Sequence, residues 1–95
     1  MEMVVEGEIV HWRGPAPHHF VPVVDDDAAA IAEVAAGLTY GWGVVPVTVE
    51  LGATTWTTSL FPRDGGYLVP LRAAVRRAEG VGIGDVVRVV LRFEL

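Results

Sequence analysis

The sequence contains no cysteine and no lysine, and it has no apolar run long enough to cross a membrane. Without cysteine the chain forms neither a disulfide framework nor a thiolate zinc site. Without lysine every cation is an arginine, whose planar fork of donors suits carboxylates and phosphates. A membrane helix needs about 20 consecutive apolar residues, and Glu2, Glu6 and Glu8 stand where a signal peptide would be basic. We therefore expect a soluble cytoplasmic protein with no membrane partner.

What the chain does contain is ample apolar surface and an uneven charge. Hydrophobic residues make up 52% of its 95 residues, which excludes intrinsic disorder and predicts a single domain over residues 1–95. The formal net charge is −5, divided into −6 over residues 1–47 and +1 over residues 48–95. An acidic total makes nucleic acid an improbable partner, because such binding depends on neutralising phosphates. A local arginine patch in the second half remains compatible with this composition.

Hydrophobic periodicity predicts a β-rich chain with two short helices. Alternation with a period of two predicts strands over Met3–Trp12, His18–Val23, Val44–Leu51, Thr54–Phe61, Tyr67–Pro70 and Asp85–Leu95. Helical spacing predicts one helix that ends at Gly37 and a second over Leu71–Glu79, closed by Gly80. In the second helix we expect Leu71, Ala74, Val75 and Ala78 to face the core.

Three consecutive carboxylates, Asp25, Asp26 and Asp27, precede the first helix. Side chains of this kind cap free amides and suit the positive end of the helix dipole. A metal site is the alternative, but consecutive residues point in different directions. We therefore favour capping and expect no bound metal there.

The order of elements repeats once, over halves of about residues 1–51 and 52–95. Phe20–Val23 corresponds to Leu68–Leu71, Val47–Leu51 corresponds to Leu91–Leu95, and Trp12 corresponds to Trp56. Such similarity indicates two halves related by a pseudo-twofold axis. We expect a closed six-stranded barrel whose ends are capped by the helices, because closure removes exposed sheet edges.

Several ordered motifs resemble a known bacterial family. They are Gly41-Trp42-Gly43, the segment Thr57–Pro62, the segment Gly66–Pro70 and the segment Arg72–Gly80. From Glu6 to Leu95 the chain resembles the family called domain of unknown function 1905. That resemblance implies a six-stranded barrel with Greek-key connections, and it implies no established activity, cofactor or catalytic residues. Over Pro70–Leu95 the chain is also similar to the swapped-hairpin barrels of transition-state transcription regulators, which bind DNA as dimers.

The strongest candidate site is a ligand-binding group on the second helix and the predicted strand Thr54–Phe61. Its members are Arg72, Arg76, Ser59, Thr57 and Trp56, with Arg77 beside them. Arg72 and Arg76 are four residues apart and share a helical face, so together they can hold a phosphate or carboxylate. The structural alternative pairs Arg76 with Glu79 and Arg72 with a strand carboxylate such as Glu50.

Two further groups are weaker candidates. His11 can be joined by His18 or His19 but not by both, since neighbours on a strand face opposite ways. No acidic residue accompanies these histidines at a metal-like spacing, so we expect no metal site. Trp42, between two glycines, is either a lid on the core or a ligand contact.

These observations favour a non-catalytic binding or interaction module without a cofactor. Its arginine-lined surface would take an anionic small molecule or a partner protein. One alternative is a small enzyme that uses Ser59 and Arg72, although no general base is evident beside Ser59. A second alternative is a DNA-binding dimer, and a homodimer is compatible with the proline-containing strands.

Overall fold

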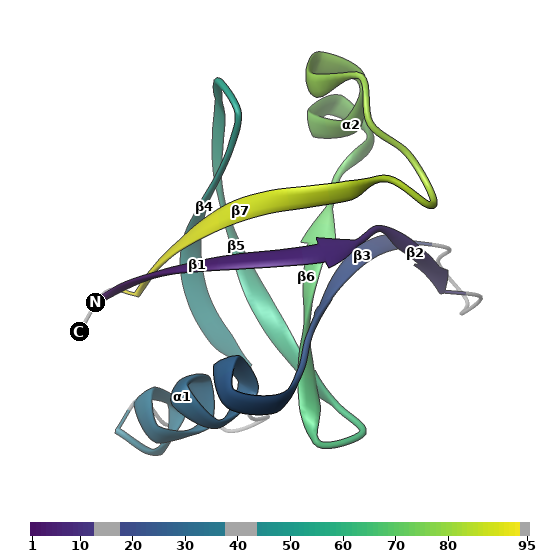
Figure 1. The fold of residues 1–95 in the computed structure, drawn as a ribbon. Helices are drawn as coiled ribbons and strands as arrows, with labels where there is room; N and C mark the ends of the chain where they lie inside the picture. Colours follow the sequence, from purple (N-terminus) through teal and green to yellow (C-terminus); the bar gives the residue numbers. More distant parts are fainter. Residues whose placement is uncertain (13–17, 38–43, 94–95) are drawn as a thin grey trace.

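A computed structural model describes residues 1–12, 18–37 and 44–93 of the chain (Figure 1). In chain order its elements are β1 (Glu2–Glu8), β2 (Val10–Trp12), β3 (His18–Val23), α1 (Asp25–Ala36), β4 (Val45–Leu51), β5 (Thr54–Arg63), β6 (Gly66–Leu71), α2 (Ala73–Glu79) and β7 (Val86–Phe93). The fold is thus mainly β with two helices. Trp42 lies outside the described residues.

The strands form one antiparallel sheet of seven strands in the order β1-β7-β4-β5-β6-β3-β2. The sheet curls into an open half-barrel, so the expectation of a closed six-stranded barrel is wrong. The seventh strand arises because the first stretch changes partner at Ile9. There the N–H of Ile9 donates to the Asp85 carbonyl and the Ile9 carbonyl accepts from Gly84. Before this break β1 pairs with β7, and after it β2 pairs with β3.

Side-chain packing brings β1 against β3 at the open side of the sheet. A Cβ built on Gly7 would lie 3.0 Å from Cγ1 of Val21 and 3.2 Å from the Pro22 carbonyl oxygen. The glycine therefore permits the close approach of these two strands. No ladder of backbone hydrogen bonds joins them in the described ranges.

The concave face of the sheet holds the core, as the alternation in the sequence predicts. Along β4 the side chains of Val45, Val47, Val49 and Leu51 are buried, and along β7 so are those of Val87, Val89, Leu91 and Phe93. The intervening positions point to the outer face, because successive strand residues alternate. These two inward sets confirm the period-two interpretation of both strands.

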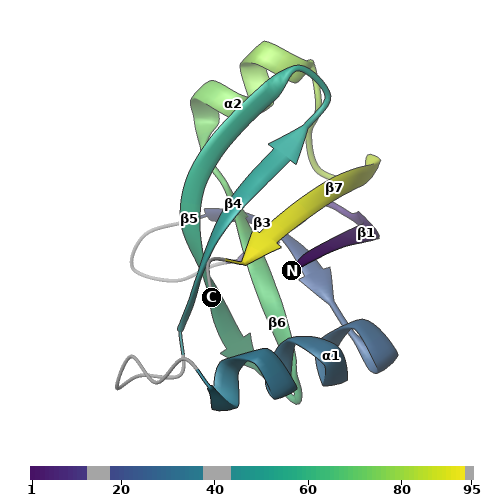
Figure 2. The same ribbon diagram turned by 90° about the vertical axis from the view of Figure 1, so that its left-hand side faces the viewer.

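The helices lie at opposite ends of the curled sheet (Figures 1 and 2). α1 buries Ala28 and Ile31 against the core, and Val34 and Ala35 pack beside them. The three aspartates occupy the first turn of α1, where they suit the helix dipole. The predicted side-chain cap is wrong, since the N-cap is Val24 and no side-chain hydrogen bond caps this end.

α2 is shorter than the sequence suggested and buries a single side chain, Val75. Leu71 is buried too, but it belongs to β6. Ala74 and Ala78 are exposed, so their predicted inward placement is wrong. A helix of seven residues at the rim of a barrel offers the core little more than one side chain. The C-cap Gly80 has φ +65°, the left-handed conformation typical of a glycine helix end.

The pairing register has the symmetry that a twofold repeat requires. In β3–β6 the pair Val21–Val69 is central, and the pairs on either side exchange under the offset of 48 residues between the two proline motifs. In β4–β7 the pair Thr48–Arg92 is central in the same way, under an offset of 44 residues.

The proposed equivalence of Trp12 and Trp56 does not fit this register. Trp12 pairs with His18. Under the offset of 48 residues His18 corresponds to Gly66 of β6, and Gly66 pairs with Arg63. The counterpart of Trp12 in the second half is therefore Arg63. Trp56 instead pairs with Val49 in β4. The tryptophans therefore occupy different places in the two halves, because the first half contains the extra residues around Ile9.

Candidate functional site

α2 is held at its end of the sheet by one polar contact at each of its termini. At the C-terminal end the hydroxyl of Thr54 donates to Oε2 of Glu79 at 2.6 Å. At the N-terminal end Nη2 of Arg72 donates to the Thr57 carbonyl at 3.3 Å. The Thr54 hydroxyl and the Thr57 carbonyl, the two sheet groups in these contacts, both belong to β5. α2 therefore runs alongside the segment of β5 that carries Trp56.

The arginines fall into two groups. Arg63, Arg88 and Arg92 each have a carboxylate oxygen within 4.0 Å. Arg72, Arg76 and Arg77 have none among the described residues. Thus every described arginine outside the α2 segment is ion-paired, and the three in or next to α2 are not.

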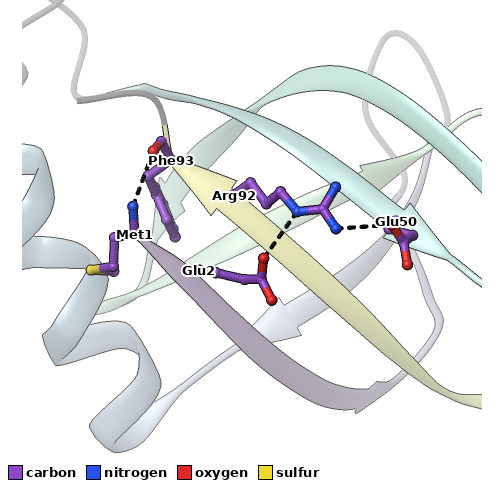
Figure 3. Close-up of polar contacts among 5 residues, drawn as sticks. All are labelled: Met1, Glu2, Glu50, Arg92 and Phe93. Carbon is purple, nitrogen blue, oxygen red and sulfur yellow. Dashed lines mark hydrogen bonds and ion pairs between the residues drawn. The ribbon is translucent and has the colours of Figure 1, made fainter.

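The carboxylates expected to neutralise α2 are bound to other residues. Glu50 accepts from Nη2 of Arg92 at 3.1 Å, while Nε of the same arginine donates to Glu2 at 3.0 Å (Figure 3). These two acidic neighbours raise the pKa of Arg92 above its ordinary value, chiefly through the hydrogen bond to Glu2. Glu79 accepts from Thr54. The structural alternative, with Arg76 on Glu79 and Arg72 on Glu50, is therefore wrong.

The histidine pair lies next to Arg76. His11 and His19 are partners in the β2–β3 register, and their ring centroids are 5.4 Å apart in an edge-on arrangement. On the other side His19 pairs with Leu71 of β6, directly before Arg72. Burial lowers the pKa of His19 below its ordinary value, and the positive charges of Arg76 and His11 lower it further.

Three buried side-chain nitrogens in the described ranges lack a hydrogen-bond partner: Nδ1 of His19, Nε1 of Trp56 and Nε of Arg76. His19 shares its inward face with Val21 by alternation, and Arg76 of α2 is close enough to His19 to act on its pKa. Trp56 lies on β5 between Thr54 and Thr57, the two residues to which α2 is bonded. All three nitrogens therefore belong to elements that meet where α2 covers the sheet. We call His19, Trp56 and Arg76 the α2 site.

A buried polar group without a partner is uncommon in native proteins and calls for an explanation. The nitrogens of arginine and of the indole ring are donors only, so what they lack is an acceptor. The α2 site therefore has donor groups without an acceptor, and Arg76 adds a positive charge beside them.

The structure does not bring all of the predicted ligand-binding residues together in one place. Arg72 and Thr57 come together at the edge of β5, whereas Arg76 lies near His19. Ser59 is half-buried opposite Pro46 and, by alternation with Leu60, points to the outer face. Trp56 is 9% exposed and points inward. Ser59 and His19 thus lie on opposite faces of the sheet.

Sequence reasoning missed the proximity of His19 to Arg76. A signal for it was nevertheless present in the repeat. If the two strands that carry the Val-Pro motifs pair antiparallel about the twofold axis, Val21 lies opposite Val69. His19 then lies opposite Leu71, beside the start of α2. The metal interpretation gains nothing from the structure, since no cluster of three or more metal-ligating residues occurs in the described part of the chain.

An open groove of about 630 Å³ lies at the opposite end, between α1 and the β5–β6 turn. Its lining includes Asp25, Asp64, Tyr67 and the small side chains of Ala28 and Ala29. Asp25 and Asp64 have φ of +55° and +49°, the two positive values among non-glycine residues of the described segments. None of the unpartnered buried nitrogens lies in this groove, so the α2 site is the stronger candidate.

The fold and the site define a small antiparallel β protein with a helix at either end and an arginine-rich surface around α2. The family model described as a domain of unknown function (DUF1905) matches residues 6–91, and the chain belongs to this family. No curated protein matches the chain. In the described residues no helix has the length and apolar character that a membrane crossing requires.

Proposed function

We propose that this protein is a non-catalytic binding module, a single domain over residues 1–95, that takes an anionic small molecule at the α2 site. The observation that carries the proposal is the set of unpartnered nitrogens on His19, Trp56 and Arg76. An anion would supply the acceptor oxygens that these groups lack. Leaving such a group unsatisfied costs about 1–3 kcal/mol, and more when it is charged.

The surrounding charge supports the same conclusion. Arg72 and Arg77 are exposed beside Arg76, and no described carboxylate neutralises any of them. Charge-assisted hydrogen bonds from arginine are stronger than neutral ones. The donor nitrogen of Arg76 is buried, which favours a small anion that enters the site over a protein surface that lies across it.

Catalysis through Ser59 and Arg72 receives less support from the geometry. The outward position of Ser59 separates it from the inward-facing His19, and nucleophilic catalysis by serine requires a neighbouring base. The DNA-binding alternative rests on a resemblance of one segment, and the acidic total charge opposes it.

Sulfate binding tests the proposal. We expect added sulfate to shift the indole N–H resonance of Trp56, assigned through Trp56→Phe, and to produce saturable heat in calorimetry. The variant Arg76→Gln should weaken binding by at least about tenfold, because a lost charged hydrogen bond is worth about 1.5–3 kcal/mol.

Arg88→Gln is the matched control. It removes one arginine that is paired with Glu6 on β7, at 3.5 Å, and should leave sulfate binding unchanged. Absence of saturable binding to the unmodified protein would contradict the proposal. So would an equal loss of binding in Arg88→Gln, since the effect would then be one of net charge. A large fall in the melting temperature of Arg76→Gln would assign this arginine a structural role instead.

A further inference from the structure

We propose that His19 is a proton-accepting member of the α2 site, so that the protein binds a dianionic oxyanion group, such as a phosphate or sulfate group, together with a proton. This inference rests on the proposed function and extends it to the charge of the ligand and to the pH dependence of binding. It is argued from the placement of His19 between β2, β6 and α2.

The groups that face His19 come from each of the elements around it. β2 contributes His11, whose ring is 5.4 Å away between centroids. α2 contributes the positive charge of Arg76, and β6 contributes the apolar side chain of Leu71 as the register partner. Among the described residues no carboxylate acts on the titration of His19. Burial and the neighbouring positive charges therefore disfavour a proton on this imidazole.

An anion reverses that balance. A negative charge within about 4–6 Å of an ionisable group favours its protonated cation by 1–3 pKa units. Nδ1 of His19 is buried and has no partner, so after protonation it has a free N–H to donate. Protonation of His19 adds a positive charge beside that of Arg76 and raises the total positive charge available to the ligand. Such a charge suits a dianion better than a monoanion.

The consequence is thermodynamic linkage between ligand and proton. Because the pKa of His19 is low in the free protein and higher in the complex, binding must strengthen as the pH falls between these two values. Sulfate keeps a double negative charge throughout this range, so any pH dependence of its affinity comes from the protein.

The experiment measures sulfate affinity by calorimetry at about pH 7.5 and 5.5, which bracket the titration of histidine. We expect affinity to be roughly fivefold higher at the lower pH, because a pKa rise of one unit changes affinity tenfold at most over the whole titration. In His19→Gln this ratio should fall to less than about twofold, whereas His18→Gln, one residue earlier in β3, should keep it. Acetate at equal concentration should bind more weakly than sulfate at both values.

A second measurement avoids the variant altogether. The pKa of His19 in the unmodified protein can be read from its ring resonances with and without sulfate, and it should rise when sulfate is bound. Saturable sulfate binding that leaves this pKa unchanged would overturn proton uptake but leave the proposed anion site intact. Acetate binding as tight as that of sulfate would overturn the dianion specificity. If neither anion binds, the proposed function itself fails.

Discussion

Gly52, at the β4–β5 turn, leaves room for the carboxylate of Glu79 at the end of α2. The variant Gly52→Ala tests how much this arrangement contributes to stability. Gly52 has φ +57°, and a Cβ built there would overlap the carboxylate of Glu79. The methyl group of alanine would displace that carboxylate from its 2.6 Å hydrogen bond with Thr54. The substitution therefore combines a backbone cost with the loss of the contact that holds the C-terminal end of α2.

The two contributions can be estimated separately. A left-handed conformation costs a residue with a Cβ roughly 1–2 kcal/mol. A hydrogen bond to a charged group contributes about 1.5–3 kcal/mol, and we take the lower end because the contact is partly exposed to solvent. Gly52→Ala should thus destabilise the fold by about 2.5–3.5 kcal/mol. For a domain of this size that is a fall in melting temperature of roughly 10–28 °C.

Urea unfolding followed by circular dichroism measures the free energy, and Gly65→Ala provides the matched control. Gly65 has φ +78° with no atom within 4 Å of the added methyl group, so it should show the backbone cost alone, about 1 kcal/mol. In a Glu79→Ala background Gly52→Ala should cost no more than this control. The reasoning is refuted if Gly52→Ala is no worse than Gly65→Ala, or if its cost is unchanged when Glu79 is absent.

Two further predictions concern the other end of the sheet and its outer face. Ile31 is fully buried where α1 meets the core, so Ile31→Ala should cost about 2–5 kcal/mol in urea unfolding; Glu33→Ala, exposed on the same helix, should stay within about 0.5 kcal/mol of the parent. Arg92→Gln removes the ion pairs to Glu2 and Glu50, and its loss of stability should shrink in 1 M salt because exposed pairs are screened. An effect of Arg92→Gln that is as large in high salt would mean that packing, and not charge, dominates at this position.

The sequence by itself determined the local character of nearly every element. Alternating valines specify which faces of β4 and β7 are buried, since the side-chain period of a strand is two. Glycine and proline mark the ends of the helices and the turns, because they depend on backbone conformations that few other residues adopt. The repeat of the Val-Pro motif carries the register of β3 with β6. The strand faces and the turns are properties of neighbouring residues, and the register follows from comparing two similar segments.

Only the tertiary structure decided how the sheet ends and how the charges pair. Whether residues 2–12 form one strand or two depends on the partners available to Ile9, and these come from residues 84 and 85, far along the chain. Likewise Glu50 and Glu79 were equally plausible partners for the α2 arginines until the fold placed Arg92 and Thr54 beside them. Ion pairs form between whichever charges the packed backbone brings within a few ångströms. The arginines of α2 were left without a carboxylate by that long-range arrangement, which the sequence pattern does not encode locally.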